Sequence, residues 1–105
     1  MPGYVTGIVA AKNSREAGRI SNALVKEKLA ACCNTIPGVK SVYRYDGKVR
    51  RASEVIVMFK TRKPLTSKVI DMIKKHHSYD VPAIEFFQMA GGNLDSLKWV
   101  NKETR

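Results

Sequence analysis

The sequence predicts an α+β fold of the ferredoxin-like type, in which two helices cover one face of a four-stranded sheet. Strand-like and helical patterns alternate along the 105 residues in the order βαββαβ, and a further helix follows at the C-terminus. An Asp-Gly pair between two strand-like stretches indicates a tight hairpin in the middle of the chain. No repeat, low-complexity run or linker divides the chain, so we expect one domain over residues 1–105.

The first part of the chain is predicted to form a strand and a helix. Residues 4–11 are apolar and β-branched, as is typical of a strand. Asn13 and Glu16 have the spacing of a capping box, in which a short polar side chain precedes a carboxylate by three residues. A helix is therefore expected over about residues 14–30.

The middle of the chain is predicted to be a long β-hairpin. Asp46-Gly47 favours a type I′ turn, which needs positive φ at both central residues. Pro37-Gly38 predicts a bulge in the arm before the turn, because proline cannot donate to a strand ladder. Val55–Phe59 is a continuous apolar run, which is typical of a central strand buried on both faces.

The second half repeats the pattern of helix and strand. Pro64 stands at a favoured first-turn position, and an apolar stripe at helical spacing follows it. The stripe consists of Leu65, Val69, Met72, Ile73 and His76. Pro82 prevents further helix, residues 83–89 are predicted to form the fourth strand, and residues 95–103 a short helix with Leu97 or Trp99-Val100 packed inward.

Charge and hydropathy limit the classes of function. The net charge is +10, from 19 Lys and Arg against 9 Asp and Glu, but no run of five or more basic residues forms a binding tail. We therefore expect a solvated basic surface and no specific nucleic-acid partner. No apolar run approaches the roughly 20 residues that span a bilayer. The N-terminal stretch also lacks the basic region of a signal peptide.

The two cysteines, Cys32 and Cys33, are adjacent, and adjacent cysteines rarely bridge because the geometry is strained. The chain is therefore not expected to be a disulfide scaffold, and two reduced thiols fit the cytosol. These thiols are either small apolar residues in the core or ligands for a soft metal.

The stretch HHSYDVPAI, residues 76–84, carries the densest chemistry in the chain. His77 is either a metal ligand, since neutral imidazole suits copper or zinc, or a histidine that ends a helix and bonds to the backbone or stacks on Tyr79. His76 continues the apolar stripe and is expected to pack. Asp80 and Glu85 have no accompanying nucleophile with a base, phosphate loop or dinucleotide fingerprint, so we expect no catalytic residues and no enzyme. Tyr79 and Asp80 are expected to line a cleft between subunits, where Asp80 would accept hydrogen bonds from Lys or Arg.

Four stretches, in order and at matching spacing, resemble the CutA divalent-cation tolerance family. They are LVKEKLAACCNTIPGVKSVYRYDGKV, SEVIVMFKT, HSYDVPAI and GGNLDSLKWV. The resemblance implies a ferredoxin-like homotrimer closed by edge-strand contacts. It also implies a role in tolerance to divalent metals, with copper as the metal most often attached to the family and no established reaction.

Carried over by position, Cys32 and His77 match the family's cysteine and histidine, which makes them the predicted metal ligands. Tyr79 and Asp80 match its Tyr-Glu pair. Ala83 replaces the glutamate that the family has after Val-Pro, and Glu85 stands two residues later.

The function predicted from the sequence is that of a small, cytoplasmic, non-enzymatic homotrimer that binds copper or another divalent cation and requires no cofactor. The alternative is a trimeric scaffold or signalling module with an anionic ligand or a protein partner in the inter-subunit cleft, for which Tyr79, Asp80 and Glu85 are the candidate residues. Three other small ferredoxin-like classes fit less well. The chain lacks the phosphate-cradling loop of acylphosphatases, the exposed strand aromatics of RNA-recognition domains and the long loop of PII-type signal proteins.

Overall fold

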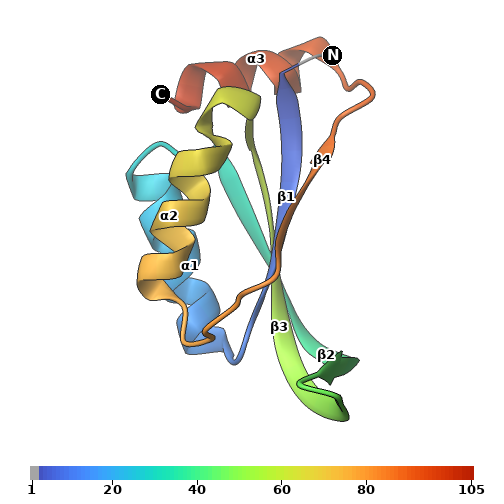
Figure 1. The fold of residues 1–105 in the computed structure, drawn as a ribbon. Helices are drawn as coiled ribbons and strands as arrows, with labels where there is room; N and C mark the ends of the chain where they lie inside the picture. The colour runs from blue at the N-terminus through green and yellow to red at the C-terminus, as the bar shows by residue number, and fades with distance from the viewer. Residues whose placement is uncertain (1–2) are drawn as a thin grey trace.

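The computed structural model describes residues 3–105, so residues 1 and 2 of the predicted domain lie outside it (Figure 1). Within this range four strands form one antiparallel sheet in the order β2-β3-β1-β4. The elements are β1 (Tyr4–Ala11), α1 (Ser14–Lys26), β2 (Cys32–Tyr45), β3 (Lys48–Arg62), the 3-10 turn η1 (Lys63–Leu65), α2 (Thr66–His76), β4 (Ile84–Gln88) and α3 (Leu94–Glu103). Figure 1 shows α1 and α2 side by side on one face of the sheet and α3 across one end of it. The predicted ferredoxin-like α+β fold with a C-terminal helix is confirmed.

Helix α1 is shorter than the predicted span of residues 14–30, because it ends at Lys26. Lys28 has a φ of 58°, in the left-handed region that a right-handed helix cannot include. The N–H groups of Leu29 and Ala30 both donate to the carbonyl oxygen of Leu24, at 2.9 and 3.2 Å. These bonds satisfy a helix-end carbonyl and turn the buried Leu29 and Ala30 into the core.

The hairpin between β2 and β3 confirms both turn predictions. Asp46 and Gly47 have φ angles of 54° and 76°, as a type I′ turn requires. The strand register shifts between Ile36 and Val39, so the bulge lies where Pro37-Gly38 predicted it. The hairpin projects beyond the two helices at the far end of the sheet (Figure 1).

The structure also shows which side chains of α2 and α3 are buried. Val69 and Ile73 of α2 are fully buried, whereas His76, which was expected to pack, is half-buried at the helix end. In α3, Leu97 and Val100 face inward and Trp99 is 39% exposed.

The prediction that β3 is buried on both faces is wrong for the single chain. Val55, Val57 and Phe59 are buried against the helices, but Met58, between them, is 36% exposed. The reason is that both helices of the βαβ units lie on the same face of the sheet, so successive side chains of β3 alternate between covered and uncovered.

The uncovered face of the sheet carries several large apolar side chains, and we call it the open sheet face. Its direct cross-strand pairs include Ile8 with Met58 and Ile36 with Ile56. Phe87 of β4 shares this face and is 59% exposed. A set of large apolar side chains on a regular sheet is the usual mark of a surface that another molecule covers.

Candidate functional site

A buried carboxylate ties the loop after α2 to the start of α1. Glu16 is 1% exposed. Its Oε1 accepts a hydrogen bond from the backbone N–H of Ser78 at 2.7 Å, and its Oε2 accepts one from the N–H of Lys12 at 2.9 Å. Asn13 caps the helix as predicted, because its Oδ1 accepts from the N–H of Glu16 at 2.9 Å. The capping residues therefore also fix the position of the HHSYD loop.

The environment of Glu16 changes its acidity. Burial by itself raises the pKa of a carboxyl group, because it disfavours the charged form. The hydrogen bonds from Lys12 and Ser78 outweigh burial, so the pKa of Glu16 is lowered from its usual value of 4.5. The folded protein therefore stabilises the ionised carboxylate.

His77 is held by the backbone at both ring nitrogens. Its side chain is fully buried, with Nε2 2.7 Å from the carbonyl oxygen of Ala10 and Nδ1 accepting from the N–H of Tyr79 at 3.1 Å. These partners assign the proton to Nε2, because a carbonyl only accepts and an amide N–H only donates. The ring also packs on Tyr79, with centroids 4.7 Å apart. A metal ion at His77 would have to replace one of these backbone bonds.

Cys32 lies elsewhere on the sheet. Cys33 packs against the core on the helix side, so Cys32, one residue before it, points to the open sheet face. Cys32 pairs with Lys60, whereas Ala10, the partner of His77, pairs with Ile56 four residues earlier on β3. The two predicted ligands are therefore not brought together in one chain. Residues 3–105 contain no cluster of three or more His, Cys, Asp or Glu side chains arranged to hold a metal ion.

The two cysteines also differ in chemistry. Burial raises the pKa of the Cys33 thiol to about 12, so this thiol is not a ready metal ligand at neutral pH. The Sγ of Cys32 lies 3.7 Å from the Oδ1 of Asn34. Of the two, only Cys32, on the open sheet face, is placed to present its sulfur to another molecule.

A cavity of about 560 Å³ lies between the β2–β3 hairpin and the loop that joins α2 to β4. Tyr79 lines it, and the Tyr79 hydroxyl donates to the Oε2 of Glu54, another lining residue, at 2.8 Å. Burial, with this carboxylate, raises the pKa of Tyr79 to about 12. The residues that line the cavity are Ala10, Ser41, Tyr43, Tyr45, Arg50, Glu54, Tyr79, Asp80, Val81 and Ala83.

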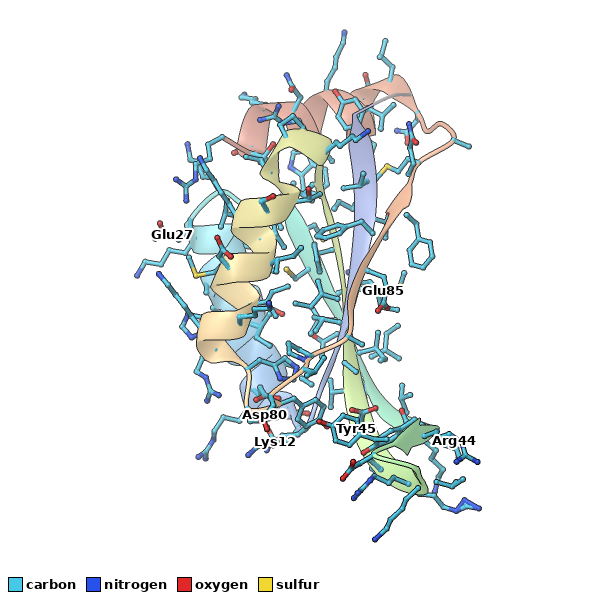
Figure 2. The ribbon with its side chains drawn as sticks, in the orientation of Figure 1. Lys12, Glu27, Arg44, Tyr45, Asp80 and Glu85 are labelled. Carbon is cyan, nitrogen blue, oxygen red and sulfur yellow. The ribbon has the colours of Figure 1, made fainter. Side chains whose placement is uncertain are left out.

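The cavity joins two of the three predicted cleft residues. Tyr79 and Asp80 line it, and Glu85 does not. Figure 2 shows Asp80 and Tyr45 at the same end of the sheet, while Glu85 projects from the side away from the helices. Ala83, where the resemblance noted in the sequence implies a glutamate, also lines this wall and adds no carboxylate to it.

Four lining residues were not among the sequence candidates: Tyr43, Tyr45, Arg50 and Glu54. These residues could have been found from the alternation of side chains between the two faces of the hairpin. Tyr43 pairs directly with Arg50, and each strand places every second side chain on the same face. Extending the I′ register outward from Asp46-Gly47 would have put these aromatic and charged side chains together.

Comparison with known proteins identifies the family of this chain. A family model described as CutA1 divalent ion tolerance protein matches residues 5–103. The chain belongs to the CutA1 family. Among curated CutA1 relatives, the divalent-cation tolerance protein CutA of Thermus thermophilus is 35% identical over 97 residues, which cover 92% of this chain and 94% of that protein. The chloroplastic protein CutA 1 of rice is 41% identical over 93 residues, which cover 88% of this chain.

Solved CutA1 structures share the fold closely. The Thermus thermophilus protein superposes with a TM-score of 0.95 at 33% identity, over 97% of this chain and 99% of that one. The rice protein gives a TM-score of 0.95 at 36% identity, over 99% and 95%. The chain spans about half the length of the rice relative, 52%, and 60% of the human one.

CutA1 relatives are named for several locations. Those of rice and Arabidopsis are named as chloroplastic, and one from Archaeoglobus fulgidus as periplasmic. In the described part of this CutA1 chain, no helix is both long and apolar enough to cross a membrane.

Proposed function

We propose that this protein acts in tolerance to divalent metals as a cytoplasmic homotrimer of one-domain chains, without catalysing a reaction. The observation that supports it best is the open sheet face, where Ile36, Met58 and Phe87 are 44%, 36% and 59% exposed in the single chain. A symmetric oligomer removes such a surface from water, and each buried side chain of this size contributes about 1.5–3 kcal/mol. Two unbridged thiols support a reducing compartment.

The assembly is tested by placing a charge on the open sheet face. Met58→Glu should shift the mass in light scattering or sedimentation from three chains towards a single chain of 11.7 kDa. The reason is that association would bury a carboxylate without a partner, which costs several kcal/mol. Lys68→Glu, at an exposed position of α2 on the helix side, is the control and should leave the mass unchanged. A wild-type protein that stays monomeric at micromolar concentration would refute the trimer.

For the metal, we propose copper with Cys32 and His77 as ligands. The placement of Cys32 on the open sheet face supports a site assembled between subunits, since the thiol would meet a neighbouring chain there. Met58 stands on the same face beside the pairing partner of Cys32, and thiolate with thioether sulfur suits Cu(I). His77 would join only by giving up its bond to Ala10 or to Tyr79.

A Cu(I) competition titration against a chromophoric chelator, under reducing conditions and at two salt concentrations, measures this directly. Cys32→Ser should lower the affinity at least about tenfold, because it removes the thiolate. Cys33→Ala is the matched control and should change the affinity little, since that side chain is partly buried and packs against the core on the helix side. His77→Ala tests the imidazole separately. Weak binding that stays the same in a Cys32→Ser/His77→Ala double variant would refute both ligands.

The alternative role, a trimeric scaffold or signalling module, rests on the cavity beside Tyr79 and Asp80. An anionic ligand there would meet two carboxylates, of Glu54 and Asp80, and only one guanidinium, of Arg50. The charge of the wall therefore does not favour an anion, and we keep metal tolerance as the proposed function.

A further inference from the structure

We propose that the cavity between the β2–β3 hairpin and the α2–β4 loop binds an organic cation, a guanidinium or a primary ammonium group, against the carboxylate of Glu54. Neither Cys32 nor His77 lines this cavity, and the proposal does not depend on metal binding. Three observations support it: an uncompensated buried carboxylate, an aromatic wall, and an internal guanidinium already packed on that wall.

Glu54 is the first observation. It is 8% exposed, and the hydroxyl of Tyr79 is its hydrogen-bond donor. No ion pair links Glu54 to a Lys, Arg or His anywhere in residues 3–105. Buried charges in proteins are almost always paired, because taking a lone carboxylate out of water is very costly. A cation from outside the chain would complete the pair.

The aromatic wall is the second observation. The side chains of Tyr43, Tyr45 and Tyr79 line the same cavity as Glu54. Aromatic faces attract guanidinium and ammonium groups through the negative charge of the ring face, and cages of this type recognise organic cations. The volume of about 560 Å³ lies within the usual range for small-molecule sites. Asp80, exposed on the same wall, adds a second carboxylate.

Arg50 provides the third observation. Its Cζ lies 5.8 Å from the centroid of the Tyr45 ring, and its Nε donates to the Tyr45 carbonyl oxygen at 3.3 Å. The wall therefore already accommodates one guanidinium. Arg50 forms no ion pair with Glu54, so the carboxylate of Glu54 is left for a second cation.

The cation that binds Glu54 has two candidate sources. A free metabolite with a guanidinium or ammonium group is one. A Lys or Arg side chain of a second subunit is the other, since each chain carries 19 of these residues. Both would place a cation against Glu54, and one experiment with two readouts separates them.

The experiment compares the full-length wild type with Glu54→Gln and Glu103→Gln. Gln keeps an oxygen that accepts from Tyr79 and removes the charge. Glu103 is an exposed carboxylate of α3, outside both the cavity and the sheet, and it serves as the matched control. The first readout is calorimetric titration with agmatine, with n-butylurea as a neutral analogue. The second is the concentration at which the oligomer dissociates, measured by sedimentation. Asp80→Asn, at an exposed position, provides a second variant if Glu54→Gln does not fold.

Agmatine that binds the wild type and Glu103→Gln once per chain, with affinity about tenfold or more lower in Glu54→Gln and no binding of n-butylurea, identifies a free cation as the ligand. If agmatine does not bind, but Glu54→Gln raises the dissociation concentration about tenfold or more above that of Glu103→Gln, the cation is a side chain of a neighbouring subunit. The proposal is overturned if agmatine binds Glu54→Gln as well as the wild type, or if Glu54→Gln changes neither readout.

Discussion

Glu16→Ala is expected to lower the free energy of unfolding by about 2–4 kcal/mol, among the largest effects of a single substitution in this chain. The change removes the acceptor for the N–H groups of Lys12 and Ser78, and it leaves an empty space where a side chain is 1% exposed. A backbone donor left without a partner costs about 1–3 kcal/mol. Chemical denaturation measures the effect. All variants are compared at one protein concentration, because the apparent stability of an oligomer depends on the concentration of its chains.

Glu27→Ala is the matched control for this prediction. Glu27 is a carboxylate at the other end of α1, half exposed, and 3.9 Å from the guanidinium of Arg105. An exposed pair of this kind contributes at most about 1 kcal/mol. Equal destabilisation by Glu27→Ala and Glu16→Ala would contradict the view that Glu16 acts through its buried hydrogen bonds.

The contribution of the Glu16 charge should also depend on pH. Its pKa is lowered in the folded state, so the stabilisation is present in full above the unfolded value of 4.5. As the pH falls below 4.5, the unfolded chain takes up a proton before the folded chain does, and the stabilisation is lost. The difference in unfolding free energy between wild type and Glu16→Gln should therefore be constant near neutral pH and shrink in acid. A difference that grows in acid would show the opposite sign of shift.

Gly7→Ala is expected to destabilise the fold by about 2–3 kcal/mol, although it adds a single methyl group. A Cβ at Gly7 would lie 2.2 Å from two atoms of the Phe59 ring, closer than any real contact. That ring is fully buried and packs edge-on against Phe86, with centroids 5.9 Å apart, so it has little room to move. Thermal or denaturant unfolding measures the loss.

Gly18→Ala gives the matched control for the same chemical change. A Cβ at Gly18 meets no atom within 4 Å, and the residue lies inside helix α1. Alanine is favoured over glycine there by about 0.5–1 kcal/mol, so this variant should be more stable than the wild type. Combining Gly7→Ala with Phe59→Leu should cost less than the sum of the two single changes, because the smaller side chain relieves the clash. Strict additivity would show that Gly7 acts through something other than contact with Phe59.

The local signals in the sequence determined the order and type of the elements. Turn chemistry at Asp46-Gly47, the cap at Asn13 and the bulge at Pro37-Gly38 depend on backbone preferences of a few adjacent residues, so they could be read without knowledge of the rest of the chain. The apolar stripe of α2 could be predicted for the same reason, since the helical spacing of its apolar residues is a local property of the sequence. The end of α1 could not be predicted in this way, because Lys28 adopts a left-handed backbone conformation that lysine does not favour.

Only the tertiary structure decided where the chemical groups meet. The sequence placed Glu16, His77 and Glu54 in three distant segments. Folding brings Glu16 into hydrogen-bond contact with Ser78, next to His77, and Glu54 into contact with Tyr79. The same packing separates Cys32 from His77 in one chain and leaves one face of β3 uncovered. Such contacts depend on strand register, on which face each helix covers and on what a second chain adds. These are long-range properties, and no window of adjacent residues contains them.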